Sequence, residues 1–224
     1  MKLFSLFSGA KCYICGQSGQ YICPLCLPKI QIYDWFDYIS KQSSKNFYIK
    51  QEYQKDFPLR QVIVLTHYHQ KWVKTLLRHA KFYGKYQAYR DLIFPYEAFF
   101  RKHTQPHNSL LIPVPIHFLR RWKRWFNQSE KISLFLSEII DIPTETKLLY
   151  RKKYTIHQSK LTKSQREIML YSAFWVKNIN TIVKNTILYL VDDVVSSGST
   201  LLECAKTLRD AWFTDIRAVV LASD

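Results

Sequence analysis

The sequence has few acidic residues and lacks the glycine-rich nucleotide motifs. Its 224 residues include 17 Asp and Glu against 33 Lys and Arg, which gives a formal net charge of +16 and an isoelectric point near 9.6. A field of this sign suits a polyanion, namely nucleic acid, a phosphorylated ligand or an anionic membrane surface. A generally basic proteome would give the same total. Neither a Walker A loop nor a G-x-G-x-x-G fingerprint occurs, so these two routes to nucleotide binding are excluded.

Long apolar runs are also lacking. No stretch reaches the length of a transmembrane helix, and the apolar start at residues 1–9 is too short and interrupted for a signal peptide. We therefore expect a cytoplasmic protein. The chain is 47% hydrophobic and 16% aromatic, which is typical of a globular protein and not of a disordered tail. Its length suits one α/β core and a small additional module.

Cysteine is concentrated near the amino terminus. Four of the five cysteines fall within fifteen residues as two C-x-x-C pairs, Cys12 with Cys15 and Cys23 with Cys26. Each pair suits a tight turn around a tetrahedral ion, and thiolate ligands favour zinc. Two disulfides are the alternative, which a reducing cytoplasm disfavours. Because four protein ligands leave no open position, we predict a structural zinc site, with the remaining Cys204 as a buried thiol of the core.

The stretch from Ile187 to Thr200 carries the main functional pattern. Ile187 to Val191 is an apolar run typical of a strand buried on both faces, and we expect Asp192 and Asp193 to follow its carboxyl end. A small-residue turn and a helix come next, and such a turn can direct several backbone N–H groups at one anion. Two acids can accept hydrogen bonds from the vicinal hydroxyls of a ribose, and the small-residue turn beside them can bind a phosphate. Together the two features predict a site for a ribose 5-phosphate. An ordinary strand–turn–helix whose Asp and Ser residues cap the helix is the alternative.

Patterns elsewhere predict the α/β fold. We expect strands near residues 62–65, 109–114, 187–191 and 216–221 in a mainly parallel sheet flanked by helices, with the ligand crevice at the carboxyl ends of the strands. Helices are expected over 70–80, over 86–100, before Pro143 and over 201–212, the last with Trp212 on its inner side. A polar stretch at 41–46 predicts a boundary between a zinc module at 1–45 and an α/β domain at 46–224.

Two basic stretches are candidates for nucleic-acid binding. The first interleaves cations with aromatic rings, the combination that single-stranded nucleic-acid binders use. The alternative is a solvated basic loop whose aromatic rings pack on the core. The second, residues 147–167, has seven Lys and Arg against one acid and is expected to be a loop that closes over a diphosphate or follows a DNA backbone. The candidate residues are Arg120, Arg121, Trp122, Lys123, Arg124, Trp125, Lys152 and Lys153.

In order along the chain, these motifs resemble those of the competence protein F (ComF) family, and the 187–200 stretch resembles the phosphoribosyl-diphosphate (PRPP) signature of type I phosphoribosyltransferases. Three positions depart from the usual ComF pattern: Trp125 stands for glycine, Met169 for asparagine, and Ser196–Thr200 for Thr-Thr-Gly-Ala-Thr. The resemblance rests on the paired C-x-x-C, Leu77…Lys81…Gly84, Pro113-Val-Pro115, Arg124–Gln128, Gln158…Arg166…Ala173-Phe174 and Val191–Val194.

The resemblance implies a type I phosphoribosyltransferase-like α/β fold and a PRPP site. Asp192 and Asp193 would bind the ribose hydroxyls, and Mg²⁺ would accompany the diphosphate. It further implies a DNA-uptake protein of natural transformation that binds single-stranded DNA and works with the uptake machinery at the inner membrane. The alternative is an active transferase that displaces diphosphate with a nucleobase or amine; no catalytic residue or acceptor is identified. The 5-phosphate would lie among Ser196, Ser197, Gly198, Ser199 and Thr200.

Overall fold

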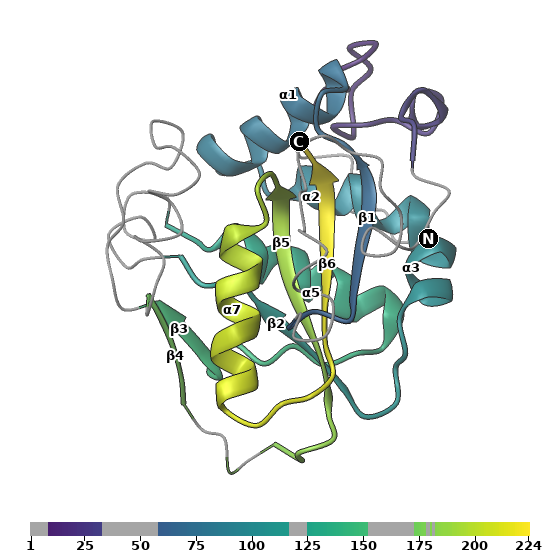
Figure 1. The fold of residues 1–224 in the computed structure, drawn as a ribbon. Helices are drawn as coiled ribbons and strands as arrows, with labels where there is room; N and C mark the ends of the chain where they lie inside the picture. The colour runs from purple at the N-terminus through teal and green to yellow at the C-terminus, as the bar shows by residue number, and fades with distance from the viewer. Residues whose placement is uncertain (1–8, 33–57, 117–124, 152–172, 178–179, 181) are drawn as a thin grey trace.

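A four-stranded parallel sheet forms the centre of the molecule (Figure 1). The computed structural model describes residues 9–32, 58–116, 125–151, 173–177, 180 and 182–224. The two inner strands are almost entirely buried, which explains their apolar sequences. The order across the sheet is β1 (Gln61–His67), β6 (Ile216–Ser223), β5 (Ile187–Val195) and β2 (Ser109–Pro113).

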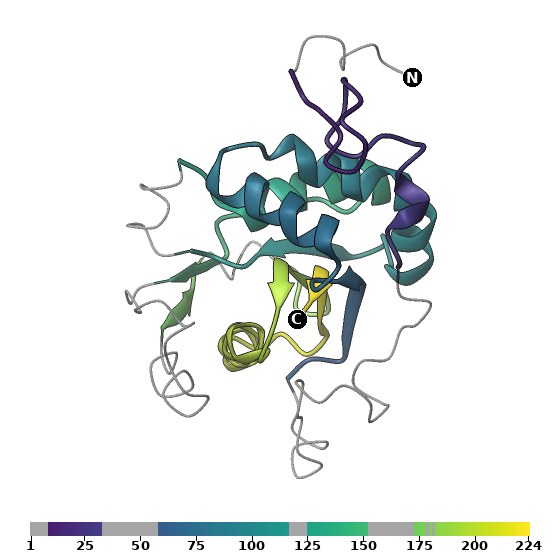
Figure 2. The same cartoon turned by 90° about the horizontal axis from the view of Figure 1, so that it is seen from above.

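Helices cover both faces of this sheet (Figure 2). Alternate strand residues face opposite ways, so Tyr189 and Val191 pack in one apolar core while Leu188 and Leu190 pack in the other. The second core is closed by α7 (Ser199–Asp210), in which Cys204 is fully buried as predicted. The first core is closed by α1 (Lys71–Phe82), α2 (Gln87–Ile93), α3 (Glu97–His103) and α5 (Gln128–Ile140).

Two helix predictions need correction. The single helix expected over 86–100 is divided into α2 and α3 by the 3-10 turn η3 (Phe94–Tyr96), which contains Pro95. Proline has no N–H group for the helical ladder, which accounts for the break. Trp212 was expected on the inner face of the last helix. It lies beyond the end of α7 with a positive φ of 74° and a side chain that is 76% exposed.

A short antiparallel hairpin, which we did not predict, lies beside α7. Its strands are β3 (Leu149–Arg151) and β4 (Phe174–Val176), and Tyr150 pairs directly with Trp175. The start of the basic stretch expected to be a loop is therefore a strand, because partners more than twenty residues later in the chain pair with it. Residues 152–167 of that stretch lie outside the described residues.

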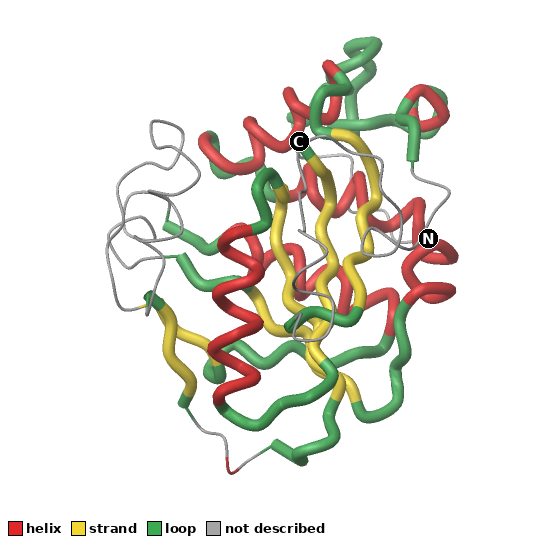
Figure 3. The backbone as a smooth tube through the Cα atoms, viewed as in Figure 1, coloured by secondary structure: helices red, strands yellow, loops and turns green. Residues whose placement is uncertain are grey.

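The cysteine-rich module is mostly loop, with one 3-10 turn, η1 (Leu27–Lys29) (Figure 3). It packs on the helical layer, because Tyr21 and Ile22 belong to the same apolar core as the inner faces of α1 and α2. The predicted boundary between residues 45 and 46 lies outside the described residues. The predicted fold class, a mainly parallel sheet flanked by helices with a small cysteine module, is confirmed. Within the described ranges, no helix is long and apolar enough to cross a membrane.

Candidate functional site

The first candidate site is a cluster of four thiols. The sulfur atoms of Cys12, Cys15, Cys23 and Cys26 all lie within 4.8 Å of one another. Sulfurs bound at 2.3 Å to a tetrahedral ion are separated by about 3.8 Å, and the Cys15 and Cys23 sulfurs are 3.6 Å apart. All four cysteines are free thiols. The cluster can therefore hold a metal ion, and the two C-x-x-C pairs predicted to meet do so.

The backbone prepares this cluster for a cation. Gly16 and Gly19 have positive φ values of 79° and 118°, so the turn between the two pairs uses conformations that favour glycine. Burial raises the pKa of the Cys12 thiol, but backbone N–H groups that donate to its sulfur outweigh this and lower the pKa to about 6. One of these donors is the N–H of Cys23, 3.5 Å from the sulfur. A thiol that ionises this readily is suited to metal binding.

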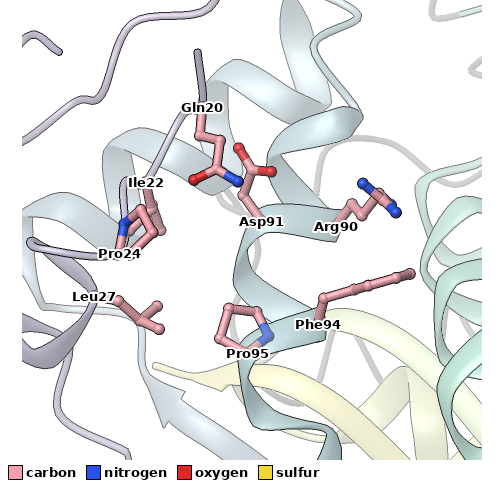
Figure 4. A pocket seen from close by; sticks show the side chains of 8 residues that line it. All are labelled: Gln20, Ile22, Pro24, Leu27, Arg90, Asp91, Phe94 and Pro95. Atoms are coloured by element: carbon pink, nitrogen blue, oxygen red, sulfur yellow. The ribbon is translucent and has the colours of Figure 1, made fainter. Parts of the chain in front are cut away.

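The module is anchored by polar contacts with α1 and α2. The N–H of Tyr21 donates to Asp91 Oδ2 at 2.6 Å, and the Tyr13 hydroxyl lies 2.7 Å from His79 Nδ1. Burial raises the pKa of Asp91 to about 6. Beside these contacts is a mainly apolar pocket of about 280 Å³, where Ile22 and Leu27 of the module lie opposite Asp91 and Pro95 (Figure 4). The cysteine module is therefore joined to the main core by both polar and apolar contacts.

The second candidate site is the acid pair near the carboxyl end of β5. The sequence predicted that both acids follow the strand, but β5 continues to Val195 because β6 supplies pairing partners as far as Ser223. Asp193 is only 3% exposed, whereas Asp192 is partly accessible. The acids are therefore held by the sheet itself, close to the edge at which parallel strands present ligands.

Two residues from distant elements hold the acid pair. Ser129, at the start of α5, donates its hydroxyl to Asp192 Oδ1 at 2.8 Å, and Lys81 of α1 forms an ion pair with Asp193 Oδ2 at 3.0 Å. Asp192 Oδ1 also accepts the N–H of Asp193, and Asp193 Oδ1 accepts the N–H of Val194. Both oxygens of Asp193 are thus engaged. Within the described residues, Asp192 Oδ2 accepts no hydrogen bond and is the oxygen best placed for a ligand.

The pKa of Asp192 is set by its surroundings. Burial raises the pKa of Asp192, and the adjacent carboxylate of Asp193 raises it further. The Lys81 ammonium, the N–H of Asp193 and the Ser129 hydroxyl act in the opposite direction without cancelling the increase. A carboxyl in this state gains from a hydrogen-bond donor or a cation, so the site favours hydroxyl groups or a metal-bound ligand.

The turn after β5 has the predicted form. Gly198 has a positive φ of 71° and is the N-cap of α7, so no side chain of the cap residue occupies the first N–H groups. Ser197 and Ser199 face each other with hydroxyl oxygens 2.9 Å apart, and the N–H of Ser199 is 3.5 Å from the Ser197 hydroxyl. The Ser197 hydroxyl thus accepts the first N–H group of α7, so the alternative of a Ser-capped helix stays open. The next N–H groups at the N-terminus of this twelve-residue helix can face an anion.

Asn127 gives a structural role to the Arg124–Gln128 motif, in which the sequence analysis named no role for the asparagine. Its side-chain oxygen accepts the N–H of Ser129 as the N-cap of α5, and its amide group donates to the backbone oxygen of Val114 at 3.1 Å. Val114 in turn donates its N–H to Val191 of β5. Asn127 therefore fixes the start of α5 to the ends of β2 and β5, which brings Ser129 to the acid pair. Sequence reasoning missed the roles of Ser129 and Lys81, although Lys81 is one of the motif residues.

Trp125 is the one candidate nucleic-acid residue of the basic aromatic stretch that the structure describes. Its side chain is 89% exposed, and its backbone has a positive φ of 65°. This left-handed conformation favours glycine, which accounts for the glycine usual at this position. The Trp125 ring does not pack on the core, whereas Phe126 of the same stretch is partly buried and its ring contacts that of Tyr86, so the alternative of an inward-facing loop stays open. Arg120, Arg121, Trp122, Lys123, Arg124, Lys152 and Lys153 lie outside the described residues.

Curated relatives match about half of the chain. The chain is 36% identical over 126 residues to "Competence protein F" of Haemophilus influenzae, a match covering 54% of this chain and 53% of that protein. It is 32% identical over 98 residues to "DNA utilization protein YhgH" of Escherichia coli K12, covering 44% and 42%. No family model matches the chain.

Solved structures with a similar arrangement were also found. Adenine phosphoribosyltransferase of Leishmania tarentolae has a TM-score of 0.41 and 12% identity, covering 72% of this chain and 91% of that one. Glutamine PRPP amidotransferase of B. subtilis has a TM-score of 0.39 and 17% identity, covering 60% and 26%. The sequence relatives, and not these structures, indicate the family. They support the assignment of the chain to the ComF family that its motifs predict.

Proposed function

We propose that the protein binds PRPP with Mg²⁺ and single-stranded DNA, and that it serves DNA uptake in natural transformation. The observation that carries the PRPP site is an acid pair on β5 that is followed within a few residues by the Gly198 N-cap of α7, near the carboxyl edge of a parallel sheet. Asp192 Oδ2 would accept a ribose hydroxyl, and the turn at 196–200 would surround the 5-phosphate. Mg²⁺ would be held largely by the diphosphate oxygens.

The metal of the thiol cluster is proposed to be zinc with a structural role. Four thiolates at tetrahedral spacing leave no position open for a substrate. The ion would also stabilise the contacts that join the module to α1 and α2, because its loss would release the residues that pack on both helices. Chemistry at this ion is not part of the proposed function.

The DNA-uptake role is supported by the names of the relatives, one a competence protein and the others DNA utilization proteins. The net charge of +16 favours a polyanionic partner. Trp125 adds an exposed aromatic ring in a conformation that costs free energy, and strain of this kind is found at binding sites. A base stacked on Trp125 would offset that cost.

A combined assay tests the proposal. Calorimetry with PRPP and Mg²⁺ should show saturable binding, and labelled single-stranded DNA should bind with an affinity that falls steeply as salt rises. Turnover of PRPP, followed as diphosphate release, is measured against a panel of nucleobases and ammonia. Release with one acceptor would support the active transferase instead. Absence of PRPP binding by zinc-loaded protein would contradict the proposed site, and a salt-independent DNA affinity would contradict the DNA role.

Trp125→Gly separates stability from binding. Glycine adopts a φ of 65° without steric cost, so the free energy of unfolding should rise by about 1 kcal/mol. If the ring stacks a base, the same change should weaken binding of single-stranded DNA about tenfold while leaving its salt dependence unchanged. Urea denaturation and fluorescence anisotropy measure the two effects. Unchanged DNA affinity in a stabilised variant would remove Trp125 from the DNA site.

A further inference from the structure

One surface close to the acid pair carries cations and aromatic rings that belong to neither candidate site. It is the outward side of α1, hereafter the α1 outer face, which lies beside the carboxyl ends of β5 and β6 (Figure 1). Its exposed positions recur at helical spacing, opposite the buried residues Val73, Leu76 and Leu77. The α1 outer face consists of Lys71, Lys74, Arg78, Phe82 and the adjoining Tyr83.

Among the described residues, no acid forms an ion pair with the cations of the α1 outer face. The sequence of α1 contains no acid, and within the described part of the chain no ion pair involves Lys71, Lys74 or Arg78. The Lys71 ammonium instead lies 4.6 Å from the ring of Trp72, and that of Lys74 lies 5.9 Å from the ring of Tyr68. Three cations along one helical face form a line that a phosphate backbone can follow.

A hollow at the end of this line offers room for a base. Its volume is about 370 Å³, within the lower part of the range of roughly 300–1,000 Å³ for ligand pockets. The hollow is lined by Phe82 and Tyr83, which are 56% and 70% exposed, and also by Arg78 and His79. Large aromatic rings exposed beside cations are the surfaces on which bases stack. The Tyr13 contact with His79 ties this hollow to the cysteine module.

The α1 outer face also lies near the candidate PRPP site. Lys81, on the same last turn of α1, reaches inward to Asp193 at 3.0 Å. A strand bound along the α1 outer face would therefore end close to the acid pair. We propose that this face binds single-stranded DNA, with phosphates on Lys71, Lys74 and Arg78 and one base against Tyr83. This inference rests on the DNA-binding part of the proposed function and gives it a site.

The test uses full-length, zinc-loaded protein and a labelled oligothymidine measured by anisotropy over a range of salt. Lys74→Gln with Arg78→Gln should lower the slope of log affinity against log salt by about 1.4, since each phosphate contact contributes about 0.7. The matched control, Lys184→Gln with Lys206→Gln, removes the same charge from exposed positions away from α1 and should leave the slope near that of the parent. Tyr83→Ala should weaken binding about tenfold, and Tyr83→Phe should restore it.

The outcomes separate the two proposals. If the parent binds DNA and the two double variants behave alike, the attraction is general and the site on α1 is overturned while the DNA role remains. If the parent does not bind DNA, the DNA role itself fails. Binding of phosphatidylserine vesicles, but not oligothymidine, through Lys74 and Arg78 would make the face a membrane surface and would equally overturn the site. PRPP binding should be unchanged in Lys74→Gln with Arg78→Gln.

Discussion

Cys23→Ser or Cys26→Ser is expected to abolish binding of one zinc ion per chain and to unfold the module around it. Binding of structural zinc contributes about 10–16 kcal/mol to the folding of zinc-finger peptides, far more than a module of this size gains from its own core. The sheet should remain folded, because its four strands pair with one another and α7 covers one face without the module, although Ile32 bridges Thr66 of the outer strand β1. Elemental analysis for zinc and hydrogen exchange by mass spectrometry measure the two effects.

The pattern of hydrogen exchange tests whether the module packs on α1 and α2. Tyr21 and Ile22 share the core of α1 and α2, so protection should be lost in the module and reduced in these two helices, but kept in β5 and β6. Cys204→Ala is the control, because this buried thiol lies in α7 on the other side of the sheet, and it should keep the full zinc content. A disulfide between cluster cysteines in protein from reducing cytoplasm, with no metal, would refute the zinc site.

Most of the central sheet was predictable from the sequence because its signals are local. Four apolar runs gave four strands, and the spacing of the cysteines gave a cluster that requires only short turns. A turn of small residues after β5 was also predicted, and within it Gly198 has a positive φ of 71°, which glycine adopts without steric cost. Each of these features depends on residues within about fifteen positions of one another.

The support of the acid pair could not be predicted, because it depends on distant contacts. Lys81 and Asp193 are 112 positions apart, and Ser129 and Asp192 are 63 apart. The extension of β5 through two acids depends on pairing with β6, which outweighs the low strand preference of aspartate. The hairpin of β3 and β4 is likewise a pairing across an interval of more than twenty residues. One motif did carry a local signal, since an asparagine before a predicted helix indicates an N-cap.

Replacing both acids, Asp192→Ala with Asp193→Ala, is expected to weaken PRPP binding by about 1.5–3 kcal/mol. The change removes the charge-assisted hydrogen bond that Asp192 Oδ2 would accept from a ribose hydroxyl, and such a bond contributes about 1.5–3 kcal/mol. The backbone pairing of β5 with β6 does not depend on these side chains, so the fold should survive. Calorimetry with Mg²⁺ and PRPP measures the affinity. Unchanged affinity in a folded double variant would place the PRPP site elsewhere.

A matched control distinguishes a lost ligand contact from a general loss of negative charge. Asp215 lies at the amino end of β6, where it forms ion pairs with Arg217 and Arg60. This is the opposite end of the strands from the acid pair. Asp215→Asn should leave PRPP affinity near that of the parent. Lys81→Met is informative in the other direction, because the Lys81 ammonium lowers the pKa of Asp192 and its removal should raise that pKa further. That variant should show a different pH dependence of PRPP binding, even if its affinity at high pH is kept.

The pH dependence of the parent follows from Asp192. Its pKa is raised in the folded protein, so between the ordinary carboxyl value and the raised value the folded state binds more protons than the unfolded state. The contribution of Asp192 to the free energy of unfolding therefore decreases as pH rises through this interval. PRPP binding should change in the opposite sense, because the ionised carboxylate is the better acceptor for ribose hydroxyls. Asp192→Asn should abolish both slopes, and a parent affinity that fell with rising pH, or an Asp192→Asn variant that kept the parent's profile, would show that Asp192 does not bind the ribose.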